Sequence, residues 1–133
     1  MPPRRSVSPN PGSYGGETMS NLLTQDLLDR LLENGARTAA GEDTDFEPVA
    51  KFFTPDGPAT WLISEVDPSD PDRAFGLCDL GLGYPELGYV RLSELAAIRG
   101  RLGLPVERDA HFRAERTLAE YARLAAAEGR IIR

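Results

Sequence analysis

The sequence is poor in cysteine and histidine and has no long hydrophobic run. Its 133 residues include one cysteine, Cys78, and one histidine, His111. A single cysteine excludes an internal disulfide and favours a reducing compartment. No apolar run approaches the roughly 18 residues of a membrane span, and the first twenty residues lack the apolar core of a secretory signal. We therefore expect a cytoplasmic protein that does not enter a membrane.

Basic residues are outnumbered, with 15 Lys and Arg against 21 Asp and Glu, for a net charge of −6. The segment from Glu42 to Glu86 holds eleven of the acids and two basic residues, whereas the segment from Arg91 to Arg133 has nine arginines and six acids. An acidic chain repels a phosphate backbone, so we do not expect direct nucleic-acid binding. The basic C-terminal third is free to meet an acidic partner or a second copy, which leaves a homo-oligomer open.

Length and composition indicate one small globular domain, with 41% hydrophobic and 27% charged residues. Pro, Gly and Ser dominate residues 1–20, so we expect a disordered tail there. The single folded domain should cover residues 21–133. Met19 directly precedes the first patterned helix, so both Met1 and Met19 remain candidate starts.

Hydrophobic periodicity predicts an α+β fold, an antiparallel sheet of about four strands with about three helices packed on one face. Short connections between neighbouring strands favour antiparallel pairing. A short edge strand is also expected within residues 104–112, and residues 67–73 are expected to form a loop. The expected helices are Gln25–Glu33, ended by Asn34-Gly35, then Ser93–Arg99 and Thr117–Ala127. The expected strands are Val49–Phe53, Thr60–Val66, Ala74–Asp79 and Leu87–Leu92.

The segment Phe75–Val90, F-G-L-C-D-L-G-L-G-Y-P-E-L-G-Y-V, is the strongest candidate for a site. Dense glycine marks a shaped connection between two strands, because glycine accepts positive φ and close approach. A hairpin centred on Asp70 would place Trp61 opposite Asp79 and Glu65 opposite Phe75, all on one sheet face. The predicted binding surface consists of Trp61, Glu65, Asp79, Gly81, Gly83, Tyr84 and Glu86.

Individual residues of this segment also have a purely structural interpretation. Asp79 would accept main-chain N–H bonds from the turn that follows it, and the glycines would permit tight turns. Tyr89 is expected in the sheet core, whereas Tyr84 in the connection is expected to be exposed. Cys78 should pack as a small hydrophobe, because a nucleophilic thiolate needs a basic partner and His111 lies far away in the sequence. We assign no catalytic residue, no metal and no cofactor.

Three stretches together resemble an uncharacterised bacterial family, domain of unknown function 2958. They read A-T-W-L-I-S-E-V-D-P, A-F-G-L-C-D-L-G-L-G-Y-P-E-L-G-Y-V-R-L and G-L-P-V-E-R-D, and the likeness covers about residues 22–128. Tyr84 and Arg91 depart from the phenylalanine and serine expected there. The resemblance implies a compact cytoplasmic accessory protein of plasmids, integrative elements and phages. It carries over no activity, cofactor or catalytic residue.

These observations favour a non-enzymatic interaction module that binds an unidentified protein partner, while enzymatic activity stays open. One alternative is a nucleic-acid mimic directed against a host defence enzyme, with Asp67, Asp70 and Asp72 standing in for phosphates. Another alternative is a metal-dependent hydrolase that uses the carboxylates of Glu65, Asp79 and Glu86.

Overall fold

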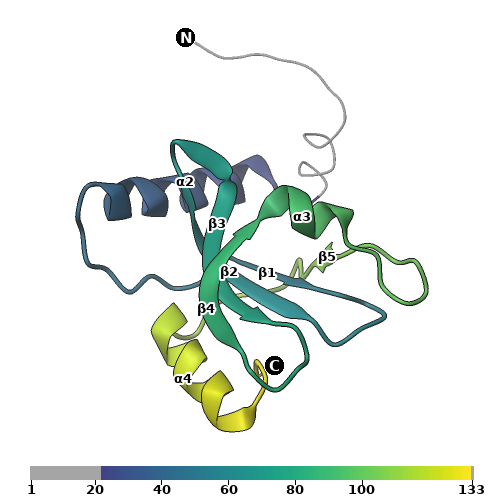
Figure 1. Cartoon of the computed structure of the whole chain (residues 1–133). Coiled ribbons are helices and arrows are strands. Elements are labelled where there is room, and N and C mark those ends of the chain that lie inside the picture. Colours follow the sequence, from purple (N-terminus) through teal and green to yellow (C-terminus); the bar gives the residue numbers. More distant parts are fainter. Residues whose placement is uncertain (1–21, 133) are drawn as a thin grey trace, which may run out of the picture.

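The computed structural model describes residues 22–132, which form a small α+β domain around an open, five-stranded antiparallel sheet (Figure 1). The strand order is β4-β3-β2-β1-β5. The expected tail in residues 1–20 lies outside the described residues. No helix within residues 22–132 has the length and apolarity to cross a membrane. The elements are α2 (Gln25–Ala39), β1 (Ala50–Phe53), β2 (Thr60–Asp67), β3 (Asp70–Asp79), β4 (Glu86–Arg91), α3 (Leu92–Ala97), β5 (Glu107–Arg108) and α4 (Leu118–Glu128).

Both faces of the sheet carry helices, so the expectation of helices on one face is wrong. Successive side chains of a strand point to opposite faces, and β2 is buried on both sides, with Leu62 and Ile63 each at most 1% exposed. The first cluster lies under α2 and α3 and contains Leu31, Phe52, Trp61, Ile63 and Leu95. The second cluster lies under α4 and contains Leu62, Leu77, Leu118, Ala125 and Ile131.

Helix α2 continues through Asn34-Gly35, where the sequence predicted its end. The Asn34 side-chain amide donates a 2.9 Å hydrogen bond to the carbonyl oxygen of Ser64. Gly35 is buried, and a Cβ at this position would collide with the main-chain oxygen of Val66. The Asn-Gly pair therefore seats the helix closely on β2, and this packing overrides its local tendency to end a helix.

A two-residue turn at Pro68-Ser69 joins β2 to β3, in place of the loop expected over residues 67–73. Asp67 pairs with Asp70 across this turn. The Asp67 carboxylate accepts hydrogen bonds from the Ser69 main-chain N–H at 2.9 Å and the Ser69 hydroxyl at 2.7 Å. Aspartate readily closes such a turn through its own side chain, so β3 begins four residues earlier than predicted.

The predicted β2–β3 register is right at one end and wrong at the other. Glu65 pairs with Phe75 as expected, but the register shifts between Ile63 and Glu65. Trp61 consequently pairs with Cys78, and Asp79 pairs with Thr60. A one-residue shift moves a side chain to the other face, so Trp61 and Asp79 lie on opposite faces of the sheet.

The C-terminal elements follow the sequence closely. Thr117 and Glu120 form a capping box at the start of α4, and Gly129 ends the helix with a φ of 76°. The expected short edge strand is present as β5, which pairs with β1. Helix α3 begins at Leu92, and Ser93 does not cap it, because the Ser93 N–H and hydroxyl both donate to the Asp72 carboxylate.

Candidate functional site

Asp79, the acid at the centre of the predicted binding surface, is buried with 3% of its surface exposed. One carboxylate oxygen accepts the Gly81 N–H at 2.8 Å, and the other accepts the Ile131 N–H at 2.9 Å. Asp79 therefore ties the β3–β4 connection to the segment after α4. This arrangement matches the structural interpretation of Asp79 rather than a role in contacting a partner.

The other residues of the predicted surface separate into three groups. Trp61 is 3% exposed and belongs to the cluster under α2 and α3. Tyr84 is 80% exposed. Gly81, Gly83 and Glu86 are exposed as well, both glycines with a positive φ, and Glu65 is half-buried on β2.

The carboxylates of the hydrolase alternative do not converge. Glu65 lies near the end of β2, Asp79 is engaged by main-chain N–H groups, and Glu86 pairs with Cys78 across the β3–β4 ladder. No group of three acidic, histidine or cysteine side chains within residues 22–132 is arranged to hold a metal ion. The described residues therefore give this alternative no site.

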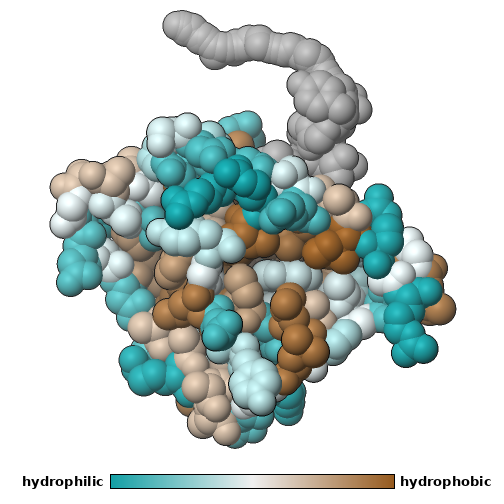
Figure 2. Space-filling view, viewed as in Figure 1, coloured by the Kyte–Doolittle hydropathy of each residue, from teal (hydrophilic) through white to brown (hydrophobic). Residues whose placement is uncertain are grey.

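The edge of the sheet at β4 carries the exposed apolar residues of the β3–β4 region. Strand β4 pairs with β3 on one side and has no strand on its other side within the described chain. Figure 2 shows separate hydrophobic residues, with paler and hydrophilic ones between them, on the face that carries β4. We use the name β4 surface for five exposed leucine and tyrosine residues of β4 and the connection before it, which are exposed by 47% to 80%: Leu80, Leu82, Tyr84, Leu87 and Tyr89.

Tyr89 of the β4 surface is 59% exposed, although the sequence predicted it in the core. Its ring lies 5.0 Å from the ring of Phe75 at an interplanar angle of 60°. The Arg73 guanidinium lies 3.6 Å from the Tyr89 ring centroid, within cation–π range. These two neighbours hold an exposed aromatic side chain in a fixed orientation. The spacing of Leu87 and Tyr89 in the sequence indicates that both side chains lie on one face of the strand. It does not indicate whether a helix covers that face.

A small pocket of about 150 Å³ lies beside Tyr89. Its lining includes Thr38 of α2 and Glu65, Arg73 and Phe75 of the sheet. The Thr38 hydroxyl donates a 3.1 Å hydrogen bond to Glu65. Partial burial raises the pKa of Glu65 above its ordinary value, and the Thr38 hydrogen bond opposes this effect. The pocket is smaller than the cavities that hold drug-sized ligands, typically about 300 Å³ or more, so it suits a single side chain.

The three aspartates proposed for nucleic-acid mimicry are paired with arginines. Arg91 contacts Asp70 at 3.1 Å and Asp72 at 3.5 Å, and Arg73 contacts Asp67 at 3.7 Å. These pairs are exposed and individually weak, but each places a positive charge next to the carboxylate. The local negative field available to a basic DNA channel is correspondingly smaller than the sequence suggested.

Cys78 and His111 are not brought together as a nucleophile and its base. Cys78 packs against the cluster under α2 and α3, whereas His111 lines a cavity on the α4 side, beside Leu62. Burial raises the pKa of the Cys78 thiol, and the nearby Glu86 carboxylate raises it further. A thiol in this environment stays protonated at neutral pH and is a weak nucleophile.

A comparison with family models shows the family. The model described as a protein of unknown function (DUF2958) matches residues 22–132. This range covers the sheet and the helices on both of its faces, and it agrees with the resemblance found in the sequence. Neither a curated protein nor a solved structure matches the chain. The chain therefore belongs to the DUF2958 family of proteins of unknown function.

Proposed function

We propose that the protein is a non-enzymatic protein-interaction module that binds its partner through β4 and the connection leading into it. The observation that carries this proposal is the open edge of β4 combined with the exposed side chains of the β4 surface. Soluble proteins usually protect an edge strand with proline, charged side chains or a covering segment. Strand β4 has a charged residue at each end, Glu86 and Arg91, but the four residues between them, L-G-Y-V, carry no charge and no proline.

The geometry suits the addition of an extended partner segment to the sheet. In this mode, main-chain hydrogen bonds supply affinity and pockets for alternate side chains supply specificity. Gly88 lies in the middle of β4 with open space at the position of a Cβ. The main chain is therefore accessible at the centre of the strand.

Tyr89 and its neighbouring pocket supply the side-chain part of this contact. An ordered, exposed tyrosine offers a large contact area at a small cost in conformational entropy, and tyrosine is enriched among residues that dominate binding energy. The pocket beside it places Glu65 within reach of one partner side chain. We expect that side chain to carry a hydrogen-bond donor or a positive charge.

The biological setting of the proposal comes from the sequence resemblance. Members of the resembled family are encoded on plasmids, integrative elements and phages, which suggests an accessory protein of a mobile genetic element. Such a protein would act in the cytoplasm on a protein of the element or of its host.

Affinity purification from the native host with quantitative mass spectrometry tests the proposal. The wild-type chain is compared with Leu87→Thr/Tyr89→Ser and with Tyr84→Ala/Glu86→Ala. Both variants should lose the same partner, because each removes side chains of the proposed contact surface on β4 or its connection. The fold should be kept, because all of these side chains are exposed. Hydrogen exchange on the recovered complex should then slow at the main-chain amides of β4.

Leu102→Ser is the matched control, because Leu102 is 79% exposed but lies on the connection between α3 and β5. This variant removes an exposed leucine without touching β4, so partner recovery should equal that of the wild type. Equal recovery by all variants, or a loss with Leu102→Ser alone, would contradict the proposal.

A further inference from the structure

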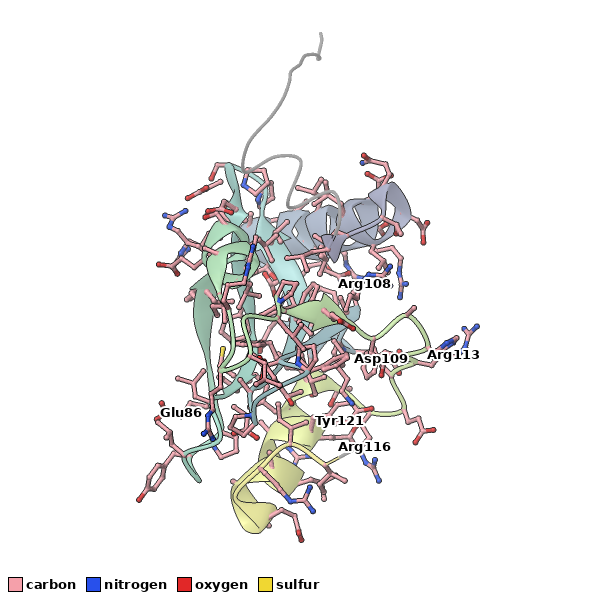
Figure 3. The ribbon with its side chains drawn as sticks, turned by 90° about the vertical axis from the view of Figure 1, so that its right-hand side faces the viewer. Glu86, Arg108, Asp109, Arg113, Arg116 and Tyr121 are labelled. Atoms are coloured by element: carbon pink, nitrogen blue, oxygen red, sulfur yellow. The ribbon has the colours of Figure 1, made fainter. Side chains whose placement is uncertain are left out.

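A second cavity, of about 320 Å³, lies on the α4 side of the sheet. Leu62, Phe112 and Ile132 provide apolar lining. Figure 3 shows the side chains labelled Asp109, Arg113, Arg116 and Tyr121 on the side of the ribbon opposite Glu86. The cavity is therefore separate from β4 and plays no part in the function proposed above.

The lining of this cavity carries a small excess of positive charge in an otherwise acidic protein. Lys51 of β1 lines it together with Arg113 and Arg116 of the segment before α4. Within residues 22–132, none of these three side chains makes an ion pair. The two acids of the lining, Asp109 and Glu115, leave one positive charge in excess.

Main-chain hydrogen bonds fix the wall of the cavity. The Asp109 N–H donates to the carbonyl oxygen of Lys51 at 2.9 Å, which fastens the wall to β1. The Asp109 carbonyl accepts the Phe112 N–H at 3.2 Å, and one Asp109 carboxylate oxygen accepts the His111 N–H at 2.9 Å. The Asp109 carboxylate is thus partly neutralised by a main-chain N–H of its own turn. This hydrogen bond reduces the repulsion between Asp109 and a bound anion.

Tyr121 adds a hydroxyl donor from the first turns of α4. Its oxygen accepts a 3.1 Å hydrogen bond from the Glu115 N–H. A phenol that accepts through its oxygen keeps its own proton for donation. The residues that line the cavity therefore include one lysine, two arginines and a tyrosine, together with the apolar Leu62, Phe112 and Ile132.

We infer that this cavity binds a small phosphate monoester of about the size of a mononucleotide. A phosphate monoester carries close to two negative charges at neutral pH, and arginine matches phosphate oxygens through its planar, forked donors. The apolar lining and the Phe112 ring would contact the organic part of the ligand. A volume near the lower end of the range for ligand pockets, about 300 Å³, excludes much larger ligands.

Titration of the isotopically labelled full chain, followed by amide chemical shifts, tests the inference. The probes are inorganic phosphate, adenosine 5′-monophosphate, adenosine and acetate at constant ionic strength. The monophosphate should give saturable shifts at residues 109–116 and Tyr121. Inorganic phosphate should shift the same amides with lower affinity, while adenosine and acetate should cause little change.

Variants separate recognition by the cavity from general attraction to positive charge. Arg113→Ala and Arg116→Ala should each weaken binding of the monophosphate about tenfold, the usual effect of losing one charge-assisted hydrogen bond. Arg116→Lys keeps the charge without the fork and should fall between Arg116→Ala and the wild type. Arg101→Ala, an exposed arginine outside the cavity lining, should bind like the wild type.

Three results would overturn the inference. The first is the absence of saturable shifts at residues 109–116 up to about 10 mM monophosphate, because a ligand with a dissociation constant of about 1 mM would nearly saturate the cavity at that concentration. The second is equal binding of adenosine or acetate. The third is an equal loss with Arg101→Ala, which would indicate non-specific attraction.

Discussion

Asp79 shows how one side chain determines the shape of the glycine-rich connection. Its two carboxylate oxygens accept main-chain N–H groups from Gly81 and from Ile131, which are far apart in the sequence. A buried N–H group without a partner is costly. The buried Asp79 side chain therefore holds the β3–β4 connection in place. The exposed residues that follow Asp79 are the ones free to contact a partner.

Asp79→Asn is predicted to destabilise the fold by about 1–3 kcal/mol, since an amide offers one acceptor oxygen and leaves one buried N–H unpaired. Urea unfolding monitored by the fluorescence of Trp61 measures this change. Glu86→Gln, at an exposed position on β4, should alter the free energy of unfolding by less than about 0.5 kcal/mol. Equal effects of the two substitutions would contradict the structural role of Asp79.

Glu65 should give stability a specific pH dependence. Burial raises its folded-state pKa above the ordinary value of 4.5, so the folded state favours the protonated form. The stabilising contribution is complete below pH 4.5 and is lost as pH rises through the folded-state pKa. Glu65→Gln should therefore unfold at higher urea than the wild type at pH 7, and this advantage should shrink toward pH 4.

Glu33→Gln provides the control for this prediction, because Glu33 is an exposed carboxylate on α2. Its effect on the urea midpoint should not change in the same way between pH 7 and pH 4. A Glu65→Gln advantage that stays constant or grows on acidification would show that burial does not disfavour the Glu65 charge.

At the residue scale, the sequence predicted which hydrogen bonds and contacts a side chain can make better than it predicted whether that side chain is buried or exposed. The exposure of Tyr84 and the main-chain role available to Asp79 follow from residue type and neighbours. The exposure of Tyr89 does not, because it depends on how far α4 extends over the second sheet face. The pocket beside Tyr89 combines Thr38 of α2 with Glu65 and Arg73 of the sheet, and no sequence spacing relates residues on separate elements.

At the scale of elements, α2 depends on close contact with the sheet at Gly35. Gly35→Ala would place a Cβ against the main-chain oxygen of Val66, where a neighbouring side chain cannot move aside. We expect a net loss of about 2 kcal/mol in the free energy of unfolding, despite the better helix propensity of alanine. Urea unfolding followed by circular dichroism measures it.

Gly88→Ala is the matched control, because no atom lies within 4 Å of a Cβ placed at Gly88. The change should leave stability within about 0.5 kcal/mol of the wild type. If Gly35→Ala were as mild as Gly88→Ala, the close seating of α2 on β2 would be wrong.

Element types were largely predictable from the sequence, whereas their limits and register were not. The capping box at Thr117 and the stop at Gly129 are local signals, and α4 follows them. The end of α2 and the register of β2 are set by tertiary contacts. A shift between Ile63 and Glu65 was enough to separate Trp61 from Asp79, because register determines which face each side chain occupies.

At the scale of the whole molecule, the domain presents different chemistry on its two sides. Strand β4 offers an open edge and exposed apolar side chains, while the cavity beside α4 is lined by apolar residues and by three basic and two acidic ones. The sequence marks these sites only in part, because Arg113 and Arg116 of the cavity belong to the basic C-terminal third, whereas Lys51 lies in the acidic segment. Arg73 and Arg91 lie among the acids and pair with them, so linear charge counts mislead about the local field.

Site-specific photo-crosslinking in the native host tests most directly whether β4 is a docking strand. A photoreactive phenylalanine analogue replaces Tyr89 in one protein and Leu102 in another, since both positions are more than half exposed. The account predicts one defined crosslinked partner from position 89 and none from position 102. No adduct at position 89, or the same adducts from both positions, would contradict it.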